Sequence, residues 1–176
     1  MKINWDATPL PTYGNFGGQQ ISGQDGAPVD SLDELFQAHD AEIHAASQDA
    51  GGLTPQELVQ AHANLIGAII DLPETSEGLL EVETATGETI ADPEATLYAG
   101  ATIIVLTAQV EQFGFDDLAL LEAELGSEDS DIPDALTKAA DYIEIGLEET
   151  GIEETYFEAV LENQVNEFIA LNLFAA

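Results

Sequence analysis

The chain has 176 residues, of which 35 are Asp or Glu and only two are Lys or Arg, so its formal net charge is −33. A surface this acidic repels phosphate backbones and disfavours anionic lipid surfaces, and we expect no nucleic-acid partner. The sequence contains no cysteine, which excludes disulfides, thiol catalysis and Cys-based zinc sites. Its 45% hydrophobic content is that of an ordinary globular protein, and its length predicts one domain with a buried core.

Repulsion among the acidic side chains destabilises the compact state unless cations screen it. The cytoplasm of a salt-adapted organism supplies such cations, and so does a calcium-containing medium outside the cell. The absence of Arg favours export, so we expect a secreted protein, with the salt-adapted cytoplasm as the alternative. The start, "MKINWDATPLPTYG", lacks the apolar segment of a signal peptide, and no apolar run has the length of a membrane span. The stretch "ENQVNEFIALNLFAA" resembles the uncleaved tail signals of bacterial export substrates and equally suits a docking helix.

The first part of the chain is rich in turn-forming residues. Glycines and prolines recur throughout residues 1–30 and predict an irregular segment. Ser31 and Glu34 then form a capping-box pattern at the start of a helix predicted over 31–47. Hydrophobic residues at helical spacing continue this helix, and His39 lies on the same stripe.

The remaining elements are mostly helical. Thr54, Pro55 and Glu57 form a strong helix start, and the helix is predicted to continue to about residue 70. Partial alternation and a Thr-Gly turn in "LLEVETATGETI" predict a short hairpin over 79–90. Further helices are predicted over 92–114, 116–125, 133–147 and 152–173. The predicted fold is therefore mainly α with one small β element.

The pair His39 and Asp40 is the strongest candidate for a functional site. Consecutive side chains on a helix diverge by about 100°, so His39 faces inward while Asp40 faces a neighbouring side. Gly14, Gly17 and Gly18 allow backbone conformations that aim several carbonyls at one point. Hard cations such as calcium bind carbonyl and carboxylate oxygens, and a neutral imidazole beside such an ion can deprotonate a water. An inward-facing His on such a helix is also typical of a core residue.

The order of these segments resembles the secreted phospholipase A2 superfamily, in its bacterial, cysteine-free form. "YGNFGG" (13–18) is similar to the calcium loop of that family, and "PVDSLDELFQAHD" (28–40) is similar to the helix that carries its His-Asp pair. "LTPQELVQAHANLIGAI" (53–69) resembles the helix that follows in bacterial members. The resemblance implies a phospholipase A2-like helical core over 1–114, and we expect residues 115–176 to form an acidic helical extension packed on it.

The resemblance also implies a chemistry and its residues. His39 would be the general base and Asp40 the carboxylate that binds Ca²⁺, with the carbonyls of Phe16, Gly18 and Gln20 completing the metal site. The implied activity is that of a secreted, calcium-binding hydrolase in lipid degradation. It would hydrolyse a glycerophospholipid ester at a membrane or micelle surface and release a fatty acid and a lysophospholipid.

The sequence departs from the family pattern in three features. Ile43 stands where a Tyr usually follows the His, and Gln20 and Ile21 stand where glycines are common. His62 stands where the bacterial pattern has the Asp that orients the base, so either His62 is the orienting partner in a modified dyad, or catalysis is weakened and calcium binding remains. Two alternatives to the enzyme remain open: a non-catalytic module that binds calcium, lipid or a protein, and a structural domain that holds no ion.

Overall fold

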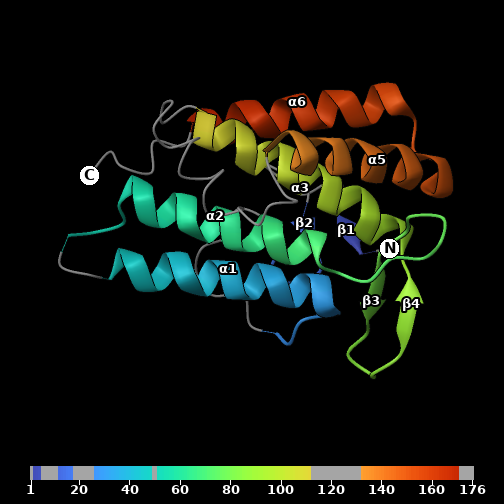
Figure 1. The fold of residues 1–176 in the computed structure, drawn as a ribbon, viewed down its shortest axis with the longest axis horizontal. Helices are drawn as coiled ribbons and strands as arrows, with labels where there is room; N and C mark the ends of the chain where they lie inside the picture. The colour runs from blue at the N-terminus through green and yellow to red at the C-terminus, as the bar shows by residue number, and fades with distance from the viewer. Residues whose placement is uncertain (1, 5–11, 18–25, 49–50, 112–131, 171–176) are drawn as a thin grey trace.

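The computed structural model describes residues 2–4, 12–17, 26–48, 51–111 and 132–170 (Figure 1). The described part is mainly helical, as expected, and it contains two small antiparallel sheets of two strands each. The helices are α1 (Ser31–Ser47), α2 (Pro55–Ile70), α3 (Pro93–Glu111), α5 (Ile132–Thr150) and α6 (Glu154–Ala170). The strands are β1 (Ile3–Asn4), β2 (Thr12–Tyr13), β3 (Glu81–Glu83) and β4 (Thr89–Ala91).

Two short strands lie within the segment expected to be irregular, so that expectation is wrong for residues 3–4 and 12–13. β1 pairs with β2, Ile3 opposite Tyr13, and both of these side chains are buried. The backbone N–H and C=O of Tyr13 then bond to those of Gly17, at 2.7 and 2.8 Å, and close a tight turn. This pairing satisfies backbone groups that burial would otherwise leave without partners.

The two helix starts differ in how well the sequence predicts them. At α2 the capping box is present, because Thr54 Oγ1 accepts from the N–H of Glu57 and Glu57 accepts from the N–H of Thr54. At α1 the predicted cap is wrong by one residue. Asp30 is the N-cap and accepts from the N–H of Asp33 at 2.9 Å. The Ser31 hydroxyl accepts instead from the N–H of Glu83 in β3, at 3.1 Å.

The other predicted elements are found close to their expected bounds. β3 and β4 form the expected hairpin, and α5 and α6 occupy the regions predicted as the last two helices. The predicted end of α3 at Gly114 and the helix predicted over 116–125 lie outside the described residues, as does residue 173.

The helices form two groups that meet at α3. α1 and α2 lie side by side and antiparallel, and α5 and α6 lie along α3 (Figure 1). The approach of α5 to α3 is close because both helices carry glycine at the contact. A Cβ on Gly100 would lie 2.7 Å from the carbonyl oxygen of Ala139, and one on Gly146 would lie 2.7 Å from Leu97 Cβ.

The expected division into 1–114 and 115–176 stays a prediction, since its boundary falls in 112–131, outside the described residues. Among the helices that the structure describes, none combines the length and apolarity needed to cross a membrane.

An aromatic cluster joins the N-terminal turn to the helices. The ring of Tyr13 stacks on Tyr98 of α3 with centroids 5.4 Å apart, and Phe36 of α1 meets the edge of Tyr98 at 5.6 Å. Such pairs contribute beyond their buried area. The cluster therefore holds the turn at 13–17 against the first turns of α1, which is where the sequence places the candidate site.

Candidate functional site

A chain of polar side chains crosses α1, α2 and α3. Nε2 of His39 lies 3.0 Å from Nδ1 of His62, and Nε2 of His62 lies 2.7 Å from Oε1 of Gln109. The two imidazole rings are nearly parallel, with an interplanar angle of 27°. Each distance is that of a hydrogen bond, so both ring nitrogens of His62 are engaged. The structure therefore brings together His39 and His62, as expected, and adds Gln109.

Burial keeps His62 uncharged. His62 is 1% exposed and Gln109 is 3% exposed. Desolvation, and then the nearby His39, lower the pKa of His62 from 6.5 to about 3, although the hydrogen bond to Gln109 opposes this shift. At neutral pH His62 is a neutral imidazole with one N–H and one lone pair. It can orient His39 but supplies no negative charge behind it.

Asp40 lies on the opposite side of the His39 ring from His62. Nδ1 of His39 is 3.7 Å from Oδ1 of Asp40, which is too long for a hydrogen bond but close enough for a strong electrostatic interaction. The side chains of His39 and Asp40 are 12% and 21% exposed, so this side of the ring is accessible to water. One nitrogen of His39 is thus held by His62, while the other faces a partly exposed carboxylate.

Asp33 holds the turn that precedes α1. Its carboxylate accepts from the backbone N–H groups of Asn15, Phe16 and Val29 at 2.8–3.1 Å, and it is fully buried. Gly14 makes this approach possible, since it has a φ of +57° and a Cβ there would lie 2.4 Å from the Asp33 carboxyl carbon. Three backbone donors on one carboxylate fix the position of the turn relative to α1.

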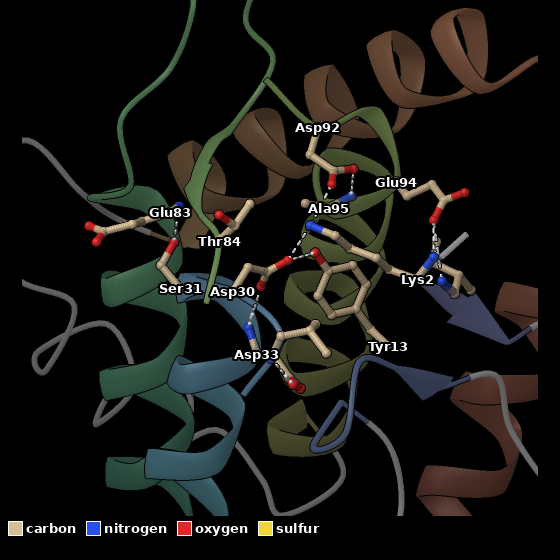
Figure 2. A network of polar contacts seen from close by, with 12 residues as sticks. Lys2, Tyr13, Asp30, Ser31, Asp33, Glu83, Thr84, Asp92, Glu94 and Ala95 are labelled. Atoms are coloured by element: carbon tan, nitrogen blue, oxygen red, sulfur yellow. Dashed lines mark hydrogen bonds and ion pairs between the residues drawn. The ribbon is translucent and has the colours of Figure 1, made fainter. Parts of the chain in front are cut away.

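A second polar network ties the N-terminus to the same turn (Figure 2). Lys2 Nζ lies 2.5 Å from Asp30 Oδ2 and 2.7 Å from Asp92 Oδ2, and the Tyr13 hydroxyl donates to Asp30 Oδ2 at 2.5 Å. The backbone N–H groups of Lys2 and the next residue bond to Glu94. Burial lowers the pKa of Lys2, but the hydrogen bonds to the two Asp residues outweigh it and raise the pKa above its ordinary value. Burial, and then the bond to Asp30, raise the pKa of Tyr13.

Two residues of the expected calcium site, Phe16 and Asp40, lie among the described residues. The N–H of Gly17 donates to the Tyr13 carbonyl, and across a trans peptide the Phe16 carbonyl then points out of the turn. That carbonyl and the Asp40 carboxylate are both oxygen donors, the kind that calcium prefers. Gly18 and Gln20 lie outside the described residues. Among the residues that the structure describes, no group of three or more acidic, His or Cys side chains is placed to hold a metal.

Two further residues of α1, Ile43 and His44, follow His39 and Asp40 in the sequence. Ile43, one turn after His39, is buried against Leu58 and Ala61 of α2, so an apolar contact occupies the place of the family's Tyr. His44 is exposed and takes no part in the chain of polar contacts.

Sequence reasoning missed Gln109 and Asp33. For Gln109 the available signal was a single amide within the apolar run of α3, and for Asp33 it was a second acid in the first turn of α1.

The chain matches no protein-family model, no curated protein and no solved structure in the comparisons made with each. The relationship to secreted phospholipases A2 therefore stays a prediction, based on the residues of the chain itself.

Proposed function

We propose that the protein is a calcium-dependent, phospholipase A2-like hydrolase of glycerophospholipid esters, with His39 as its general base. The observation that carries the proposal is the 3.0 Å contact between His39 and His62. It supplies the orienting partner that a modified dyad needs, on the neighbouring antiparallel helix. The proposal also includes two further expectations. The helices would form a phospholipase A2-like core, and the protein would be exported from the cell.

In this proposal each side chain has one task. His39 Nδ1, on the accessible side of the ring, takes a proton from the water that attacks the ester carbonyl. His62 holds the other nitrogen of His39 and keeps the ring from rotating. Because His62 is neutral and buried, it stabilises the protonated base less than a carboxylate would, and we expect modest turnover.

Asp40 and the carbonyls of Phe16, Gly18 and Gln20 would hold Ca²⁺, which would supply electrostatic stabilisation for a developing oxyanion and for the substrate phosphate. The task of the chain is to hold those oxygens in place. Asp33 does so for the turn that carries Phe16, since it accepts two backbone N–H groups there and a third from Val29, just before α1.

The net charge of the protein indicates which phospholipids it can approach as substrates. A net charge of −33 repels bilayers of anionic lipid, and the repulsion falls as salt screens it. We therefore propose zwitterionic phospholipids as substrates. Anionic vesicles are expected to be hydrolysed more slowly at low salt, with the difference shrinking at high salt.

A second candidate function follows from the lack, among the described residues, of a charged group on the side of His39 that faces His62. The residues behind the base, His62 and Gln109, carry no charge, so the site has lost the carboxylate of the family's dyad. The alternative is a calcium-binding module, with lipid or a protein as partner, that keeps the fold without turnover.

The test combines calcium binding with product release. Calorimetric titration of wild type and Asp40→Asn measures calcium binding, and release of lysophospholipid from phosphatidylcholine micelles, with and without calcium, measures turnover. We expect binding that Asp40→Asn abolishes and calcium-dependent release that His39→Ala abolishes. His44→Ala is the matched control, because His44 is an exposed histidine on the same helix. Binding without release would establish the second candidate, and neither binding nor release would overturn both.

A further inference from the structure

We propose that the negative charge of Asp40 sets the direction of the hydrogen bonds through His39, His62 and Gln109. Neutralising that charge, by a bound cation or by substitution, selects the direction in which His39 Nδ1 carries a lone pair. With the charge uncompensated, the chain runs the other way and Nδ1 carries a hydrogen. The direction is a property of the folded protein, and only its effect on catalysis rests on the proposed function.

The three side chains allow two directions. A neutral imidazole donates from one nitrogen and accepts at the other, and both nitrogens of His62 are engaged, so all donors in the chain point the same way. In the first direction Gln109 accepts from His62 Nε2–H, His62 Nδ1 accepts from His39 Nε2–H, and His39 Nδ1 is bare. In the second direction every donor is reversed, and His39 Nδ1 carries the hydrogen.

Gln109 is the residue that leaves the direction open. Its amide presents an oxygen or an N–H group at the same place after half a turn about its last bond. An ionised carboxylate at that position accepts only, and would allow the first direction alone. The amide atom 2.7 Å from His62 Nε2 is Oε1, and an N–H group would make the same contact after that half turn, so this distance fits both directions. Gln109 is thus a positioning residue, which acts on His39 through His62.

Asp40 favours the second direction when its charge is uncompensated. In the first direction the bare Nδ1 of His39 faces the carboxylate across 3.7 Å, and a lone pair beside a negative charge is unfavourable. In the second direction the Nδ1–H dipole faces the same carboxylate and is attracted to it. Among the described residues, no other Asp or Glu oxygen lies within 4.0 Å of the His39 ring nitrogens.

The consequence is a base that is available only when Asp40 is neutralised. Each imidazole keeps one proton in both directions, so the change is a rearrangement and not a net gain or loss of protons. In the second direction His39 has no lone pair on the accessible side, so it cannot take a proton from a water there. A cation bound to Asp40 would therefore favour the form of His39 whose Nδ1 carries a lone pair and can act as a base.

The direction can be read from ¹⁵N resonances of the imidazole rings, since a ring nitrogen that carries a hydrogen and a bare one differ widely in shift. The chain has three histidines, and exposed His44 serves as the internal reference. Spectra are compared at about pH 8, where ordinary imidazoles and carboxylates are unprotonated. The samples are wild type with chelator, wild type with calcium, and Asp40→Asn with chelator.

We expect the bare nitrogen to be Nε2 in both His39 and His62 of the wild type with chelator. It should change to Nδ1 in both rings with calcium and in Asp40→Asn. The same bare nitrogens in all three samples would overturn the proposal. A change in Asp40→Asn without one on calcium addition would uphold it and would remove calcium from the proposed function. A change on calcium addition without lipid hydrolysis would uphold it and would contradict the enzyme.

The role of Gln109 is tested separately. Gln109→Glu should show bare Nδ1 in both rings even with chelator, because the introduced carboxylate only accepts. Gln60→Glu is the matched control, a partly exposed Gln on α2 whose substitution adds the same charge, and it should behave as wild type. A Gln109→Glu spectrum that still responds to calcium as wild type does would overturn the assignment of Gln109.

Discussion

His39 and His62 lie on adjacent antiparallel helices, with Nε2 of the first 3.0 Å from Nδ1 of the second. His62→Leu removes this partner and leaves the His39 ring free to rotate. We expect kcat to fall about 100-fold, the scale of a general-base contribution, with little change in KM or in calcium affinity. Steady-state release of lysophospholipid measures both constants. His44→Leu is the control, and an equal loss in that variant would contradict an orienting role for His62.

Acid should destabilise the protein through His62. The pKa of His62 is about 3 in the folded protein against 6.5 ordinarily, so between these values the unfolded chain binds a proton that the folded protein does not. Stability is therefore full above 6.5 and falls as the pH is lowered toward 3, at up to about 1.4 kcal/mol per pH unit.

Urea unfolding at constant high salt, from about pH 7 to about pH 4, measures this loss. Protonation of the many carboxylates changes the stability of wild type and His62→Leu alike, so the difference between the two isolates His62. Parallel pH profiles for the two proteins would show that His62 is not held neutral in the fold.

The role of the Asp33 carboxylate in holding the turn at 13–17 can be tested by substituting two glycines. Gly14 and Gly52 both have positive φ, +57° and +69°, but a Cβ at Gly52 meets nothing within 4 Å. Both Ala substitutions should cost about 1 kcal/mol from backbone strain. Gly14→Ala should cost about 2 kcal/mol more, because its Cβ displaces the Asp33 carboxylate from backbone N–H groups. Chemical unfolding of both variants gives the difference, and equal losses would mean that the turn adapts without cost.

The chain's two lysines provide the second matched pair. Lys2→Met should destabilise by about 3 kcal/mol, because it leaves two buried carboxylates, Asp30 and Asp92, without their cation. Lys138→Met should cost about 1 kcal/mol or less, since the pair of Lys138 with Glu74 is more exposed. Thermal and urea unfolding measure both losses. A larger effect at Lys138 would contradict the role given to the network around Lys2.

The sequence predicts local structure well where one segment carries all the interacting groups. The start of α2 is such a case, because Thr54, Pro55 and Glu57 lie within one turn, and Thr54 and Glu57 bond to each other. The start of α1 is not, because Asp30 and Ser31 both suit a cap. The choice follows from distant partners: Ser31 bonds to β3, while Asp30 caps the helix and also binds Lys2 and Tyr13.

The candidate site shows the same limit. The contact of His39 with His62 was predictable from a resemblance that aligns both helices. Gln109 was not predictable, since it lies 47 residues from His62 in the sequence and a lone amide in an apolar helix has no periodic signal. The expected ligands Gly18 and Gln20 lie outside the described residues and stay predictions.

By itself the sequence determined the helical character, the hairpin, the start of α2 and the extreme acidity of the protein. These depend on periodicity, capping and composition, which act between residues close in the chain or do not depend on position at all. Only the tertiary structure decided that His62 is buried and neutral, that Gln109 ends the polar chain, and that Asp33 clamps the turn. Each of those depends on which helices pack together, because burial and hydrogen bonding between distant residues are properties of the packed fold.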